Sequence, residues 1–133
     1  MKYLLDTHVF LWTVFTPDKL SGKARRTIED PDNLIYVSTI TYWEISLKYG
    51  LGKLLLTNVL PDALPDISKQ MDFETMNVDE HTASTFYKLP RDLHKDPFDR
   101  LVVWQAISQN VVLITKDKTL SSYKKLGLKT LWR

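Results

Sequence analysis

The chain has 133 residues, of which 44% are hydrophobic and 26% are charged, which is ordinary for a folded domain. The absence of cysteine excludes disulfide bonds, thiolate zinc sites and a cysteine nucleophile. No apolar run approaches the roughly 20 residues of a membrane span, and Asp6 interrupts the short apolar segment near the N-terminus. We therefore expect a cytoplasmic protein that forms one domain over residues 1–133.

The net charge of +2 is distributed unevenly along the chain. Residues 1–87 carry 8 basic and 12 acidic side chains, whereas residues 88–133 carry 10 basic and 4 acidic ones. A basic rim suits a polyanion whose backbone approaches the protein, although a solvated lysine-rich surface has the same composition. The cations expected at such a rim are Lys88, Arg91, Lys95, Arg100, Lys116, Lys118, Lys124 and Lys125.

The first half of the chain begins with a predicted apolar strand at residues 2–5. It continues with a helix at 7–15, a polar helix at 21–28, a buried strand at 34–37 and a helix from residue 39 or 41 to 49. Over residues 53–70 we expect only short helical pieces, because Pro61 and Pro65 prevent one uninterrupted helix.

The second half repeats the alternation of strands and helices. It predicts, in order, a strand at 73–78, a helix from 79 towards 87, a charged loop at 90–95, a helix at 97–108, a strand at 111–115, a short helix at 120–126 and a strand at 129–132. Such alternation favours a parallel sheet covered by helices on both faces. The expected fold is an α/β class, three-layer α/β/α sandwich with a central, mostly parallel sheet.

Four carboxylates fall where predicted strands end or where the next helices begin. Asp6 and Asp117 follow strands, and Glu44 and Asp99 lie near helix starts. The carboxyl ends of parallel strands border the crevice where ligands bind, so we expect these side chains to converge. Clustered carboxylates repel one another unless a cation lies among them, and Mg²⁺ or Mn²⁺ suits oxygen ligands.

Each acid also has a purely structural interpretation. Asp6 can cap the following helix, and Asp117 can initiate a turn. Thr41-x-x-Glu44 has the spacing of a capping box, and Glu44 can alternatively pair with Lys48 one turn later. Asp96-Pro97-Phe98-Asp99 has the residue types that favour a helix start.

Five segments carry a resemblance to a known family. They are Met1-Lys2-Tyr3-Leu4-Leu5-Asp6-Thr7-His8, Trp43-Glu44-Ile45, Gly52-Lys53-Leu54, His94-Lys95-Asp96-Pro97-Phe98-Asp99-Arg100 and Leu113-Ile114-Thr115-Lys116-Asp117. In this order and spacing they resemble the PIN-domain ribonucleases, especially the VapC-type toxins of bacterial toxin–antitoxin pairs. The resemblance covers essentially the whole chain.

The resemblance implies a PIN-like fold and Mg²⁺- or Mn²⁺-dependent hydrolysis of RNA phosphodiester bonds. By position, the catalytic and metal-binding acids fall on Asp6, Glu44, Asp99 and Asp117. For the adjacent Asp96, we favour the role of helix cap over that of metal ligand. The side chains that could support these acids or contact substrate are Thr7, Asp96, Arg100 and Thr115. A homodimer and a cognate antitoxin protein are the implied partners.

Two other functions compete with this interpretation. A receiver-like signalling domain would also bind Mg²⁺ in an acidic pocket and accept a phosphoryl group. However, such domains have two adjacent acids after the first strand, whereas Asp6 precedes a threonine here. A catalytically silent PIN-fold binding module would share the fold, although the acids at all four matched positions argue against it.

Overall fold

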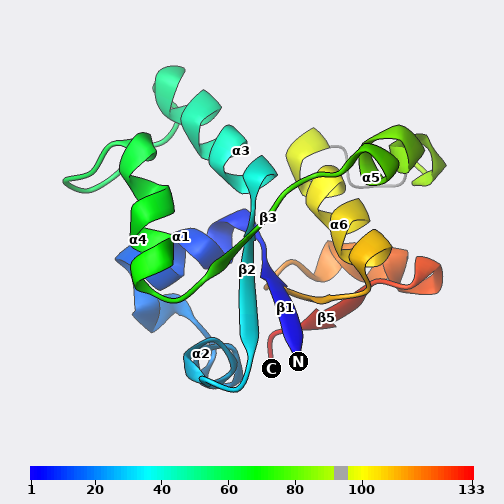
Figure 1. Cartoon of the computed structure of the whole chain (residues 1–133), viewed down its shortest axis with the longest axis horizontal. Helices are drawn as coiled ribbons and strands as arrows, with labels where there is room; N and C mark the ends of the chain where they lie inside the picture. The colour runs from blue at the N-terminus through cyan, green and yellow to red at the C-terminus, as the bar shows by residue number, and fades with distance from the viewer. Residues whose placement is uncertain (92–95) are drawn as a thin grey trace.

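The computed structural model describes residues 1–91 and 96–133 (Figure 1). His94 and Lys95, which the sequence places in a charged loop, lie outside the described residues. At the centre is a five-stranded sheet in which every pairing is parallel, in the order β3-β2-β1-β4-β5. The strands are β1 (Lys2–Leu5), β2 (Leu34–Ser38), β3 (Glu74–Met76), β4 (Val112–Ile114) and β5 (Lys129–Leu131).

The central strand β1 shows how the sheet divides the core. Its side chains alternate between the two faces, as in any strand. Tyr3 and Leu5 join one buried apolar cluster, and Leu4 joins the other. At the end of β1, Leu5 is aligned with Val37 of β2 and with Ile114 of β4. The residues that follow these three strands therefore emerge at the same edge of the sheet.

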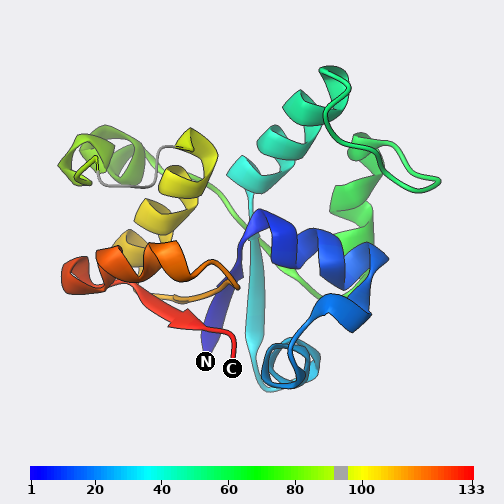
Figure 2. The same ribbon diagram turned by 180° about the vertical axis from the view of Figure 1, so that it is seen from behind.

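Helices cover both faces and make the expected α/β/α sandwich (Figures 1 and 2). On one face lie α1 (Thr7–Phe15), α2 (Gly22–Glu29) and α4 (Leu64–Gln70). On the other lie α6 (Pro97–Gln109) and η4 (Lys118–Leu126), with α5 (Glu80–Thr85) packed against α6. Helix α3 (Thr39–Gly50) contributes to both clusters, through Ile45 and Ile40 respectively.

Three short 3₁₀ segments complete the described secondary structure: η1 (Pro17–Lys19), η2 (Pro61–Ala63) and η3 (Phe86–Lys88). The expected short pieces between residues 53 and 70 correspond to η2 and α4. The expected helix at 120–126 is a 3₁₀ helix that begins earlier, at Lys118. Over the residues that are described, no helix combines the length and the apolar character needed to span a lipid bilayer.

Candidate functional site

Asp6 lies at the end of β1 and at the start of α1. Its backbone N–H donates to the Ile114 carbonyl at 3.1 Å, which ties it to β4. Its side chain caps α1 by accepting a hydrogen bond from the Val9 N–H at 2.8 Å. The capping interpretation is therefore confirmed for Asp6, and the cap holds its carboxylate at the carboxyl edge of the sheet.

Glu44 lies on α3 and is 2% exposed. The Thr7 hydroxyl donates to its carboxylate at 2.6 Å, and Lys48 forms an ion pair with it. The capping-box interpretation is wrong, because α3 begins at Thr39 and the Ser38 hydroxyl caps it by accepting from the Ile40 N–H. The Glu44 side chain instead crosses from α3 to the start of α1.

Asp96 and Asp99 lie at the N-terminus of α6. One Asp96 oxygen accepts from the Phe98 and Asp99 N–H groups at 2.9 and 3.2 Å, so Asp96 is the N-cap. Its second oxygen lies 4.0 Å from the Lys48 ammonium, which also pairs with Glu44. Lys48 thus links α3 to the start of α6, a contact that sequence reasoning missed because only its partner four residues away could be read from spacing.

Among the described residues, Glu44, Asp96 and Asp99 form a close group of carboxylates. Each offers one oxygen, and these three oxygens lie within 4.8 Å of one another. Mg²⁺ and Mn²⁺ prefer oxygen ligands, and Mg²⁺ is held by one or two carboxylates together with water. The donor set therefore fits a hard divalent cation.

Asp99 also connects this group to the remaining acids. With Asp6 and Asp117 it lines a small cavity of about 60 Å³, which His8 and Thr7 also border. Asp117 in turn caps η4 by accepting from the Thr119 N–H at 2.9 Å. The acids thus form two overlapping groups that share Asp99, and Asp6 and Asp117 are not members of the three-carboxylate group.

The charges in the site influence one another. Desolvation raises the pKa of Asp6 to about 6, and the neighbouring Asp99 carboxylate adds to this, although hydrogen bonds from Thr115 and the Val9 N–H oppose it. Partial burial lowers the pKa of Lys48, but its hydrogen bond to Glu44 and the nearby acids outweigh burial and raise it overall. Lys48 is therefore a positive charge within the carboxylate group.

The two remaining predicted side chains have different surroundings. Thr115 is buried, hydrogen-bonds to Asp6 and accepts from the Asp117 N–H at 3.1 Å, so it contacts two of the acids. Arg100 donates to the Leu89 carbonyl at 3.1 Å, and its guanidinium lies over the Phe86 ring. These contacts support a structural role for Arg100, and its predicted contact with Asp99 or phosphate stays a prediction.

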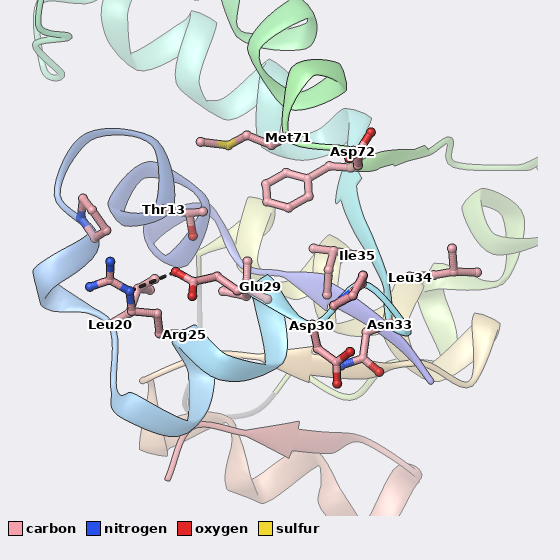
Figure 3. A pocket seen from close by; sticks show the side chains of 14 residues that line it. Thr13, Leu20, Arg25, Glu29, Asp30, Asn33, Leu34, Ile35, Met71 and Asp72 are labelled. Atoms are coloured by element: carbon pink, nitrogen blue, oxygen red, sulfur yellow. Dashed lines mark hydrogen bonds and ion pairs between the residues drawn. The ribbon is translucent and has the colours of Figure 1, made fainter.

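A much larger cavity, of about 650 Å³, lies at the opposite edge of the sheet (Figure 3). It is bordered by the start of β2 at Leu34 and by Phe73 just before β3. The Arg25 and Glu29 side chains in its wall pair with each other at 3.0 Å. None of the acids at the carboxyl edge of the sheet lines this cavity, so size alone does not identify the candidate site.

Comparisons with known proteins identify the family to which the sequence is similar. Residues 3–126 match the family model of the PIN domain. Over 129 residues, 97% of each chain, the sequence is 30% identical to Ribonuclease VapC22 of Mycobacterium tuberculosis.

Solved structures agree on the fold. The chain resembles one from VapBC2 of Rickettsia felis bound to a promoter DNA fragment, with a TM-score of 0.71 and 19% identity over the whole of both chains. A chain of DNA-bound VapBC from Salmonella typhimurium gives a TM-score of 0.65 and 20% identity over 98% of this chain and 97% of that one. The family match and the near full-length similarity to VapC22 together show that the chain belongs to the PIN-domain family, as a VapC-type member.

Proposed function

We propose that this protein is a divalent-metal-dependent endoribonuclease and the toxin of a toxin–antitoxin pair. The observation that carries the proposal is the group of carboxylates from α3 and the start of α6, beside Asp6 and Asp117, in a chain 30% identical to a ribonuclease. A receiver-like signalling domain is no longer a competing interpretation, because the chain belongs to the PIN-domain family.

We infer that Asp6, Glu44, Asp99 and Asp117 are the catalytic and metal-binding residues, with Mg²⁺ or Mn²⁺ as the ion. When bound, the ion supplies positive charge that stabilises the charge developing on the scissile phosphate. Only one carboxylate oxygen of Asp96 caps α6, so its second oxygen is a further candidate ligand of the ion.

The chain itself orients these acids through buried hydroxyl groups. Thr7 donates to Glu44, and Thr115 hydrogen-bonds to Asp6. The N-termini of α1 and α6 each contribute a partial positive charge, which offsets some of the repulsion between the carboxylates. Loss of a hydrogen bond of this kind to a ligating side chain typically lowers metal affinity or activity by about 10- to 100-fold.

The proposed partners are RNA, a cognate antitoxin and a second copy of the chain. The similarity to chains of VapBC complexes supports the antitoxin, since those structures contain toxin and antitoxin together. An antitoxin that covers the carboxyl edge of the sheet would block RNA from the acids. Addition of the purified antitoxin to the protein should then suppress cleavage.

The test compares Asp99→Asn and Asp6→Asn with the wild-type protein in RNA cleavage with Mg²⁺, Mn²⁺ or EDTA. We expect cleavage only with a metal ion, and a loss of at least about 100-fold in either variant. Asp62→Asn, which changes an exposed acid on η2, is the matched control and should retain activity. Full activity in Asp99→Asn would remove Asp99 from the mechanism. A wild-type protein that binds metal without cleaving RNA would instead be a silent PIN-fold binding module.

A further inference from the structure

A second concave surface lies directly beside the acids, between the loop after β4, η4 and the end of β5. Its volume is about 660 Å³, within the range of roughly 300–1,000 Å³ found for ligand sites. In Figure 2 the orange segment that contains η4 lies next to the red β5 strand. We call this surface the basic cavity, and the lining residues that define it are Lys116, Asp117, Lys118, Lys124, Trp132 and Arg133.

The basic cavity has an excess of positive charge. Four of its lining side chains are cations, and Asp117 is its single acid. The ion pairs formed by the described residues use Arg25 and Lys48, and none of them uses a cation of the basic cavity. Lys118 and Lys124 are both exposed, so their ammonium groups are available to an anion.

The basic cavity adjoins the candidate active site through shared residues. Asp117 lines the basic cavity and also the small cavity that contains Asp6 and Asp99. Thr115 lines the basic cavity as well, and its hydroxyl contacts both Asp6 and the Asp117 N–H. A strand whose scissile phosphate lies at the acids would therefore place a neighbouring nucleotide in the basic cavity.

Trp132 adds an aromatic wall to the cavity. Its carbonyl accepts a hydrogen bond from the Ser21 hydroxyl, and its ring lies 5.9 Å from that of Trp12 at an interplanar angle of 57°. The start of α2 thus holds the backbone at Trp132, and α1 holds its ring, which remains partly exposed. Aromatic side chains beside cations are the usual means of binding single-stranded RNA, because bases stack on rings and phosphates contact lysines.

We propose that the basic cavity binds the RNA nucleotide next to the scissile phosphodiester, with Lys118 and Lys124 on its phosphate and Trp132 against its base. This inference rests on the proposed ribonuclease function, because that function places the scissile phosphate at the acids.

Two adjacent lysines on η4 provide a matched pair for the test. Lys124 lines the basic cavity, whereas Lys125 lines a different hollow with Arg91 and Pro90. Lys124→Ala and Lys125→Ala remove the same charge from neighbouring positions. The binding of a fluorescein-labelled single-stranded RNA of eight nucleotides is measured by anisotropy in EDTA, which prevents metal-dependent cleavage.

We expect Lys124→Ala to raise the Kd by about tenfold and to lower the salt slope by about 0.7, as the loss of one phosphate contact predicts. Lys125→Ala should change the Kd less than twofold. Trp132→Leu should weaken binding without changing the salt slope, because stacking releases no counterions. Thermal melting of each variant shows whether it remains folded, and Trp132→Phe should recover part of the affinity.

Equal weakening by Lys124→Ala and Lys125→Ala would overturn the proposal, because it would indicate diffuse electrostatic attraction. No weakening by either variant, or no RNA binding by the wild-type protein, would overturn it too. Wild-type cleavage with Mg²⁺ is measured on the same preparation. Cleavage with equal lysine effects refutes the role of the basic cavity alone. Lys124-specific binding without any cleavage refutes the proposed nuclease, and the basic cavity is then an RNA-binding surface with no scissile phosphodiester beside it.

Discussion

Asp6 combines a structural role with an electrostatic cost. It caps α1, yet its burial beside Asp99 raises its pKa to about 6. An ordinary aspartate in an unfolded chain has a pKa of about 3.9, so the folded state binds the proton more tightly than the unfolded state. The stability of the metal-free protein should therefore fall as the pH rises from about 4 to 6 on account of this residue.

Asp6→Asn separates the two roles, because asparagine caps a helix about as well as aspartate. Without metal, we expect the variant to be more stable than the wild type by roughly 2 to 3 kcal/mol at pH 8, and by no more than about 0.5 kcal/mol at pH 4. Urea unfolding in EDTA at both pH values measures this difference. The comparison with the wild type cancels the contribution of the other titrating groups. A variant that is less stable than the wild type at pH 8 would mean that capping and hydrogen bonding by the charged form outweigh the desolvation of Asp6.

At the scale of elements, the start of α6 holds two acids with different surroundings. One oxygen of Asp96 caps the helix, and the other lies 4.0 Å from the Lys48 ammonium. Asp99 lies in the first turn of the helix and belongs to both groups of acids. A cap and a ligand respond differently to substitution. This difference can decide whether Asp96 belongs to the metal site.

We expect Asp96→Ala to cost about 1 kcal/mol of folding free energy through loss of the cap, and Asp96→Asn to cost much less. If the free oxygen of Asp96 also binds the cation, both variants should weaken Mn²⁺ binding by about 10- to 100-fold. Chemical denaturation in EDTA and calorimetric titration with Mn²⁺ measure the two effects separately. Unchanged Mn²⁺ affinity in Asp96→Asn would restrict Asp96 to capping.

The capping residues also show how far the sequence predicts the site. The structural interpretations of Asp6, Asp96 and Asp117 as cap or turn residues are confirmed, because each of the three caps a helix. Local patterns reveal such contacts because the partners lie two or three residues away. The contacts of Glu44 with Thr7 and of Lys48 with Asp96 join different elements, so they depend on how α1, α3 and α6 pack and could not be read from spacing.

For the whole molecule, the alternation of strands and helices was sufficient to predict a parallel sheet with both faces covered. The strand order was not predictable, because the residues of apolar strands such as Leu34–Ser38 and Val112–Ile114 do not indicate which strand each one pairs with. The placement of β4 beside β1 is what brings Asp6 and Asp117 into one cavity. The sequence predicted the edge at which the acids meet, and packing determines their division into two groups.

The exposed apolar face of α3 is a candidate surface for the proposed second copy of the chain. Trp43 and Leu47 lie one turn apart on this helix and are 66% and 44% exposed, and Leu51 and Leu55 beyond it are 60% and 90% exposed. Trp43 therefore lies outside the core, on the exposed side of α3. Apolar surface of this kind marks interaction sites, and aromatic residues are enriched in them.

Trp43→Asp should convert a dimer to a monomer, because a two-fold interface would bury this position twice and leave two unpaired charges there. Light scattering coupled to size exclusion measures the mass, and Tyr87→Asp, at an aromatic residue on η3 that is 80% exposed, is the control. A dimer that persists in Trp43→Asp would place the interface elsewhere, and a monomeric wild type would contradict the homodimer itself.

Because α3 also carries Glu44 and Lys48, an interface on its outer face would restrain the helix that presents the buried acid of each site. The monomeric variant should therefore also bind Mn²⁺ more weakly than the wild type.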